Sequence, residues 1–502
     1  ANAYNTRDQV NRDLHEGLAR VSEIVGGGFR PKSVIAGFLA AAVLAVSPFY
    51  YGASQYVNHD LTVAVWITAA LLSFAAALPA DGAWRPGWLL AGCASAGLAV
   101  LSKGLVGVVL PLGIATAWAL ATRRWIRPAW LSLGAGAAVL VALVLPWTAA
   151  VQAANPDFLH YFVVTQHFQR FAGRGFNNPM GPAFYPLLLA AGLLPWTPLL
   201  PAAVRRAWIA FRGDRSDRGA DLLLLLWPAA VVVFFSIPRS KIAGYVTPAL
   251  PPLALLLGRW WDEALSAGGG KPPRSMRVSA CLMAALAPVL LAAPLVPEGL
   301  LPWRAASALA AAGLAALGAA ALALVALRQG RVGLSFASHA AFAAALCAGV
   351  LLAVPHAVRH GSGPLAERLR PLLRPGDAVV CYRNYPHDLP VLLDRREPLV
   401  VADDWDDPAI PAKDNWRREL WLGRQRRPEA TAWLVTPDRL ATLCSGEARC
   451  FVVARRRAVS ELEGLNLATL AVVGNRVLLA SPAVAAPLLE EAEVEAEAPR
   501  AR

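Results

Sequence analysis

Eleven apolar stretches within the first 355 residues constrain the fold of this chain more than any other feature. Several of them, including residues 131–151 and 305–327, approach or exceed the length needed to cross the hydrocarbon layer of a bilayer. Hydrocarbon offers the backbone no hydrogen-bond partners, so stretches of this kind cross membranes as α-helices. The composition agrees, because 56% of the 502 residues are hydrophobic and only 16% are charged. The sequence therefore predicts a polytopic α-helical membrane protein, with spans at 33–51, 61–79, 88–102, 105–122, 131–152, 183–203, 222–238, 242–258, 279–297, 303–327 and 334–355.

The positive charge of the loops falls mostly on alternate sides of these stretches. Fifteen lysines and arginines lie in the loops of one side and six in the loops of the other. Because cytoplasmic loops carry the excess of lysine and arginine, the richer side is predicted to face the cytoplasm. With a cytoplasmic start and eleven spans, the region from residue 356 onward is expected outside the cytoplasm.

Four regions are predicted from these patterns. Residues 1–32 form an atypical N-terminal segment without an apolar span, and residues 33–355 form a transmembrane domain of about eleven helices. Residues 356–482 have a soluble composition with short strand-like runs at 378–382, 431–435 and 450–454, which predicts a small extracytoplasmic α/β domain. Residues 483–502 form an acidic tail that is expected to be disordered.

The charge distribution and the cysteines argue against nucleic-acid binding and against a cysteine metal site. The net charge of +13 arises from arginines in short loops between apolar spans, which is typical of topology determinants and not of a nucleic-acid partner. Neither the number nor the spacing of the six cysteines suggests a metal site. Cys444 and Cys450 flank a short polar loop, and whether they form a disulfide is left open.

The six lysines and arginines in the loops of the less positive side are the strongest indication of a functional site. They lie near aromatic residues and near one carboxylate, Asp60, which together indicate a cleft for an anion such as a lipid-borne phosphate. A purely structural role is the alternative for three of these features. Asp60 would be a helix N-cap, Lys103 would extend its side chain to the membrane interface, and the segment 152–182 would form an amphipathic helix on the membrane surface. The six cations are Lys103, Arg170, Arg174, Arg239, Lys241 and Arg304.

The same segments carry a resemblance to a known family. The matching pieces include, in order, Ser47-Pro-Phe, Asp60-Leu-Thr, Leu98-Ala-Val-Leu-Ser-Lys-Gly104, Gln166-His-Phe-Gln-Arg-Phe171 and Phe234-Phe-Ser-Ile-Pro-Arg-Ser-Lys241 with Tyr245. In the soluble region they include Pro375-Gly-Asp-Ala-Val-Val-Cys-Tyr382 and Asp388-Leu-Pro390. As an ordered set they resemble polyprenyl-phosphate-sugar glycosyltransferases of the GT-C type, in the protein mannosyltransferase-related family that includes aminoarabinose lipid A transferases. The resemblance covers roughly residues 33–480.

This resemblance implies a reaction and a site. Such enzymes, in the bacterial inner membrane, move a sugar from undecaprenyl phosphate to lipid A or another acceptor at the periplasmic face, with no cofactor and no metal. Asp60 is the expected catalytic carboxylate. The residues expected to bind the lipid phosphate are Lys103, Arg170, Arg239, Lys241 and Tyr245, and further candidates for the cleft are His59, Gln166 and His167.

Departures from the family pattern leave alternatives open. Residues 1–32 contain neither the initial span nor the acidic outer loop of family members, so the chain is expected to lack the N-terminal part and with it the leading candidate for the general base. In addition, Asn177-Asn-Pro179 stands where relatives often carry a histidine. A catalytically impaired fragment or binding-only relative is therefore one alternative. A transporter or flippase of an anionic lipid is another, although neither an internal repeat nor charge near the membrane centre favours it.

Overall fold

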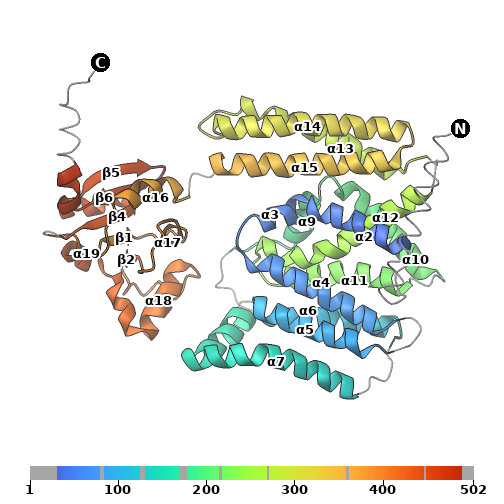
Figure 1. The fold of residues 1–502 in the computed structure, drawn as a ribbon, viewed down its shortest axis with the longest axis horizontal. Helices are drawn as coiled ribbons and strands as arrows, with labels where there is room; N and C mark the ends of the chain where they lie inside the picture. The colour runs from blue at the N-terminus through green and yellow to red at the C-terminus, as the bar shows by residue number, and fades with distance from the viewer. Residues whose placement is uncertain are drawn as a thin grey trace. The chain divides into compact units, whose positions relative to one another are not determined.

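The chain divides into two compact units, of which one ends at residue 355 and the other begins at residue 356. The computed structural model describes residues 31–79, 84–124, 130–169, 178–213, 218–267, 271–357, 361–445 and 448–488. The first unit is helical and the second contains a mixed sheet (Figure 1).

The helical unit contains a helix at each of the eleven predicted apolar stretches. Its elements are α2 (Pro31–Ala45), α3 (Pro48–Ser54), α4 (His59–Ala77), α5 (Pro86–Lys103), α6 (Val106–Ala121), α7 (Trp130–Ala154), the π-helix η1 (His160–Gln169), α9 (Phe184–Gly192), η2 (Thr197–Leu199), α10 (Leu200–Arg212), α11 (Arg218–Ser236), the 3-10 helix η3 (Ala243–Ala249), α12 (Leu250–Ser266), α13 (Arg274–Leu291), η4 (Ala293–Leu295), α14 (Trp303–Arg328) and α15 (Val332–Ala357).

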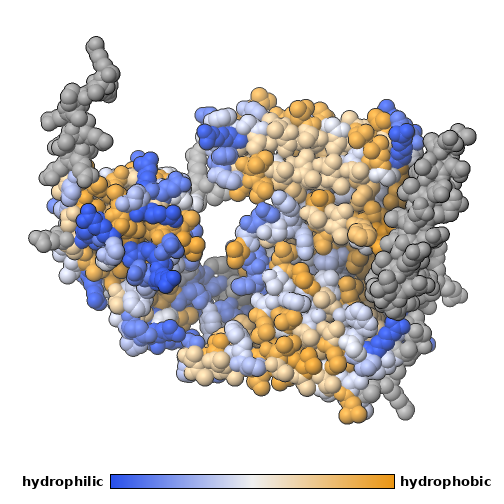
Figure 2. All heavy atoms as spheres, viewed as in Figure 1, coloured by the Kyte–Doolittle hydropathy of each residue, from blue (hydrophilic) through white to orange (hydrophobic). Residues whose placement is uncertain are grey.

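Six of the described helices are long and apolar enough to cross a membrane, or eight if each of two bent helix pairs counts as one span. The other three predicted spans correspond to α5, α6 and α12, whose 18, 16 and 17 residues are fewer than the roughly 20 of a typical span. The chain is thus a multi-pass membrane protein, and eleven spans remains a prediction. The surface is consistent with a membrane protein. Little of α7 is buried inside the protein, and hydrophobic residues cover most of the helical unit in the view of Figure 2.

Prolines explain where the apolar stretches bend. The pair α2 and α3 meets at 67°, and Pro48 opens α3 directly after the bend. Proline lacks a backbone N–H and disfavours a helical conformation in the residue before it, so a helix ends there and a new one begins. The second bent pair, α9 with η2 and α10, turns by 108° around Leu194-Pro195 and Pro198. Such breaks leave backbone N–H and C=O groups without helical partners, which membrane proteins tolerate where these groups line a cavity.

The second unit contains a six-stranded sheet in the order β3-β2-β1-β4-β6-β5. The first four strands in this order are parallel, and β6 and β5 are antiparallel. The strands are β1 (Ala378–Tyr382), β2 (Val400–Ala402), β3 (Leu434–Val435), β4 (Cys450–Arg455), β5 (Ala468–Val473) and β6 (Arg476–Ala480). The helices are α16 (Gly363–Leu369), η5 (Arg370–Leu372), α17 (Leu389–Leu392), α18 (Trp416–Arg426), η6 (Pro428–Ala432), α19 (Pro437–Leu443) and η7 (Arg456–Leu465).

The sheet has an apolar core on both faces, which is why its strands are near-continuous apolar runs. Alternate residues of β1 and β4 enter the two cores, Cys381 and Phe451 on one face and Val380 and Val452 on the other. The predicted α/β domain is therefore confirmed, with strands at the predicted runs 378–382 and 450–454. The third predicted run, 431–435, is a strand only at its last two residues.

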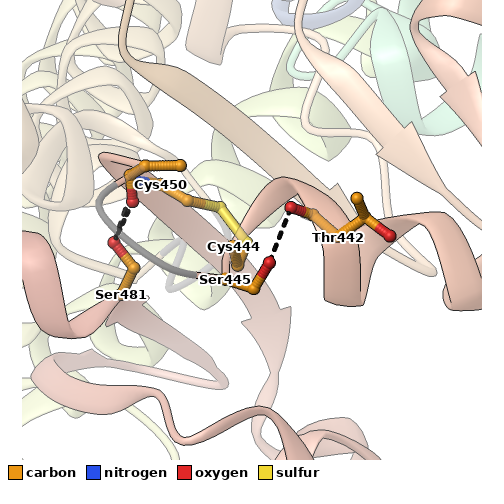
Figure 3. The surroundings of a disulfide bond; sticks show 6 residues. Thr442, Cys444, Ser445, Cys450 and Ser481 are labelled. Carbon is orange, nitrogen blue, oxygen red and sulfur yellow. Dashed lines mark hydrogen bonds between the residues drawn. A yellow bond between two sulfur atoms is a disulfide. The ribbon is translucent and has the colours of Figure 1, made fainter.

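A disulfide joins Cys444, after α19, to Cys450, the first residue of β4 (Figure 3). The Cys450 amide donates to the Ser481 hydroxyl at 3.1 Å, and the Ser445 hydroxyl donates to the Thr442 carbonyl at 3.0 Å. The cross-link therefore fixes the end of α19 to the start of β4, a central strand of the sheet. The pairing that the sequence left open is present in the structure.

Candidate functional site

Asp60 lies in the first turn of α4, and its side chain is buried. It is not the N-cap of that helix, so the structural alternative suggested by the sequence is wrong. Asn58 caps α4 instead, because its side-chain oxygen accepts a hydrogen bond from the Asp60 amide at 2.5 Å. The carboxylate of Asp60 is thereby left to interact with a neighbouring helix. An acidic group in the first turn is also stabilised by the positive end of the helix dipole.

Lys103 is the last residue of α5, and its ammonium group forms an ion pair with Asp60. The same ammonium group lies 4.3 Å from the centre of the Tyr245 ring, a cation–π contact. Gly104 ends the helix at φ 85°, a backbone conformation that glycine adopts freely and other residues rarely do, and α6 begins two residues later. The Lys103 side chain is 25% exposed, so an incoming anion has access to it.

The 3-10 helix η3 brings Tyr245 to this ion pair. Its Gly244 lies directly against Asp60, and a Cβ atom at this position would overlap the carboxylate. The preceding turn is fixed by the buried Tyr185, whose hydroxyl donates to the Ile242 carbonyl at 3.1 Å. Asp60, Lys103 and Tyr245 thus form one cluster at the ends of α4, α5 and η3.

Arg239 and Lys241 line a pocket of about 390 Å³ in the turn between α11 and η3. Lys241 is buried and donates from its ammonium group to the Pro238 carbonyl, whereas Arg239 is exposed. The other lining residues are Pro179, Met180, Pro182, Ser236 and Ile237.

The backbone of this turn is held by a short antiparallel contact with the segment before α9. The Lys241 amide donates to the Asn178 carbonyl at 3.1 Å, and the Met180 amide donates to the Arg239 carbonyl at 3.1 Å. A bridge between Pro179 and Ser240 completes the contact. The two cations are therefore presented by a fixed turn.

His167, on η1, reaches the turn that follows Lys103. Its Nε2 atom accepts a hydrogen bond from the Leu105 amide at 3.2 Å, so the proton of the neutral ring lies on Nδ1 and is donated to the Phe162 carbonyl at 2.6 Å. This satisfies an amide at the start of α6 that has no helical partner. Gln166 donates to the Tyr161 hydroxyl at 2.7 Å. The predicted helix in this segment is present, as a π-helix.

Two of the remaining candidates, Arg170 and Arg174, lie outside the described residues. His59 is exposed, and within the described ranges no contact joins it to Lys103 or Tyr245. Nor do the described residues contain a group of three or more His, Cys, Asp or Glu side chains suited to a metal ion.

Two residues of the site were missed in the sequence. Asn58 carried a detectable signal, since asparagine just before an apolar helix is a common N-cap. Gly244 carried none, because its importance depends on the approach of α4, which lies far away in the sequence.

Comparisons with known proteins agree with this architecture. The family model described as dolichyl-phosphate-mannose-protein mannosyltransferase matches residues 29–162, and a domain of unknown function matches residues 1–47. The undecaprenyl phosphate-alpha-4-amino-4-deoxy-L-arabinose arabinosyl transferase of Erwinia tasmaniensis is 34% identical over 263 residues, which are 51% of this chain and 46% of the relative. The Pseudomonas aeruginosa protein of the same description (strain PAO1) is 36% identical over 271 residues, 52% of this chain and 48% of the relative. The chain thus spans about half the length of the curated relatives it matches.

A solved structure matches a larger share of the chain. The crystal structure of ArnT from Cupriavidus metallidurans bound to undecaprenyl phosphate has a TM-score of 0.73 and 25% identity, covering 89% of this chain and 79% of that one. The apo structure of the same protein gives a TM-score of 0.71 at 24% identity, covering 94% of this chain and 87% of that one. The chain therefore has a GT-C membrane fold with a C-terminal α/β domain and is similar to aminoarabinose transferases, which confirms the resemblance inferred from its motifs.

Proposed function

We propose that this chain transfers a sugar from undecaprenyl phosphate to lipid A, or to another cell-surface acceptor, at the periplasmic face of the bacterial inner membrane. The observation that carries the proposal is the cluster of Asp60, Lys103 and Tyr245 in a fold that matches ArnT bound to undecaprenyl phosphate. The excess of cations in the alternate loops supports the orientation. The disulfide of the C-terminal unit supports an oxidising compartment for that unit.

In this proposal the cations bind the phosphate of the donor. Lys103 is the principal group, with Lys241 and Arg239 from the neighbouring turn and Arg170 from the outer segment. Negative charge grows on the departing phosphate oxygen as its bond to the sugar carbon breaks, and nearby ammonium and guanidinium groups stabilise that charge. Tyr245 holds the Lys103 side chain through its ring and offers a hydroxyl to the same phosphate.

Asp60 is proposed to receive the proton of the acceptor hydroxyl. The oxygen of that hydroxyl forms the new bond to the sugar carbon while the electrons of the broken bond leave with the phosphate. While Lys103 is paired with Asp60, the carboxylate is occupied. The donor phosphate competes for Lys103, so its binding frees the carboxylate for the acceptor. His59, Gln166 and His167 are then candidates for contacts with the sugars.

A binding-only protein is the second candidate, favoured by the same ion pair, because a carboxylate held by an ammonium group is not a free base. An assay of sugar transfer distinguishes the transferase from the binding-only protein. The full chain in proteoliposomes, supplied with undecaprenyl phosphate-aminoarabinose and lipid A, is expected to add one aminoarabinose unit to lipid A, detected by mass spectrometry. Binding of the donor without this product would support the binding-only protein. Movement of a fluorescent undecaprenyl phosphate across the bilayer without product would instead support a flippase.

A further inference from the structure

The parallel part of the C-terminal sheet changes direction between β1 and β4. From β1 the chain adds β2 and then β3 on one side, and then returns to add β4 on the other side of β1. At such a switch point the connections that leave the two central strands diverge. They open a crevice at the carboxyl ends of the strands, where open α/β sheets bind their ligands.

Three arginines lie at this crevice. Arg383 follows β1 directly, Arg455 is the last residue of β4, and Arg457 lies two residues further on. Together with Ala458 and Glu461 they line a pocket of about 270 Å³. Arg383 adopts a φ of 47°, a left-handed conformation that is uncommon for a residue other than glycine and concentrated at functional sites.

The charges of this pocket are not balanced. Glu461 is the one carboxylate among its lining residues, and it is already engaged by the Tyr382 hydroxyl at 3.0 Å and by Arg383 at 3.1 Å. Within the described part of the chain, the side chains of Arg455 and Arg457 have no hydrogen bond or ion pair. Three guanidinium groups and one carboxylate leave a net charge of about +2.

A second pair of like charges lies at the same end of the sheet. Arg455 on β4 is paired in register with Arg476 on β6, and like charges directly opposite each other in a sheet are destabilising. Arg476 donates to the Ser362 hydroxyl at 2.5 Å and interacts with the Asp388 carboxylate, whereas Arg455 lines the pocket and its side chain, within the described residues, has no hydrogen bond or ion pair of its own. An anion in the crevice would offset this repulsion.

We propose that this pocket binds a phosphate monoester, a site additional to the proposed donor site of the helical unit. A phosphate monoester carries about −1.5 to −2 charges at neutral pH, which matches the pocket better than a single carboxylate does. Guanidinium groups also present paired N–H donors in the geometry that phosphate oxygens accept. The phosphate comes either from the head group of a phosphorylated glycolipid or from a soluble phosphate ester.

Calorimetric titration of the full chain in phosphatidylcholine nanodiscs tests the site. The probes are inorganic phosphate and glucose 1-phosphate, with glucose as the uncharged control. Arg457→Gln and Arg455→Gln are each expected to weaken phosphate binding about tenfold, as expected for the loss of one charge-assisted hydrogen bond. Glu461→Gln is expected to tighten binding, because it removes the only carboxylate of the lining.

Arg456→Gln is the matched control, because Arg456 is an exposed neighbour of the same charge that does not line the pocket. Equal loss of binding in Arg456→Gln and Arg457→Gln would reduce the effect to general electrostatics and overturn the site. So would unchanged binding in both pocket variants. Retained binding in Lys103→Ala with Lys241→Ala separates this site from the donor site, whatever the outcome for the proposed reaction.

The two sources of the phosphate are distinguished by nanodiscs that contain diphosphoryl lipid A. Binding to these discs that depends on Arg457 and is at least about tenfold tighter than binding of glucose 1-phosphate assigns the site to a lipid head group. Binding to the discs that is no tighter than that of glucose 1-phosphate assigns the site to a soluble ester.

Discussion

Gly244 lies so close to the carboxylate of Asp60 that a Cβ atom on residue 244 would overlap it. The backbone of η3 therefore forms one wall of the position that Asp60 occupies. This contact ties the start of α4 to η3, and through Tyr245 to Lys103 at the end of α5. The geometry of the proposed catalytic group thus depends on a residue that has no side chain.

Gly244→Ala is expected to lower the rate of sugar transfer at least about tenfold, because Asp60 must move away from Lys103. Overpacking of this kind costs about 1–3 kcal/mol, so the melting temperature should fall as well. Gly318→Ala is the control, since a Cβ atom there meets no atom within 4 Å. A variant Gly244→Ala with the wild-type rate would show that the position of Asp60 does not matter to the reaction.

Asn58 and Asp60 are adjacent in the fold but have separable roles. Asn58→Ala removes the cap of α4 and is expected to cost about 1 kcal/mol of stability, while the transfer rate per folded molecule stays close to that of the wild type. Asp60→Asn is expected to abolish transfer, a loss far larger than the accompanying fall in melting temperature from the broken ion pair with Lys103 explains. Thermal unfolding and initial rates measured on the same preparations check both. If instead both variants lose stability and rate in parallel, Asp60 has only a structural role.

The disulfide between Cys444 and Cys450 closes a loop with a sequence separation of 6. Because a short loop loses little entropy on closure, the double variant Cys444→Ser with Cys450→Ser is expected to destabilise the C-terminal unit by roughly 2 kcal/mol. Thermal unfolding of the full chain, with and without a reducing agent, measures this. Reduction should lower the melting temperature of the wild type and leave that of the double variant unchanged.

The stability of the C-terminal unit should depend on pH through Asp388. Partial burial alone raises the pKa of this carboxyl group, but hydrogen bonds from the Ser362 hydroxyl and amide, with the charge of Arg476, lower it below the ordinary value. A lowered pKa means that the folded state binds its proton less readily than the unfolded state. The stabilisation is therefore complete above the ordinary pKa of about 4 and is lost as the pH falls below it. Asp388→Asn should show a smaller loss of melting temperature between pH 5 and 3 than the wild type; an equal loss would contradict this assignment.

The apolar stretches predicted the helices well, because the bilayer requires both their length and their composition. Asp60 and Lys103 could be singled out from the sequence because charged side chains are rare at the boundaries of apolar stretches. Their pairing was not visible. It depends on how α4 packs against α5, and the sequence contains no signal for the register of that contact.

The arginines of the C-terminal pocket illustrate the same limit. Arg383 is separated from Arg455 and Arg457 by more than 70 residues of sequence, and only the strand order brings the three to one crevice. Strand-like runs in the sequence predicted β1 and β4 but not that these strands are neighbours. The disulfide was similarly left open, because cysteine spacing alone does not fix the pairing.

The most direct test of the central claim is the initial rate of aminoarabinose transfer to lipid A by Lys103→Ala, compared with Lys271→Ala. Lys271 is an exposed lysine in the loop before α13, on the side predicted to be cytoplasmic, so it controls for the loss of one positive charge. If Lys103 binds the donor phosphate, its removal should lower the rate about 100-fold or more at equal protein levels, as the loss of a transition-state charge contact does. Lys271→Ala should keep the wild-type rate. Equal rates in the two variants would contradict the account.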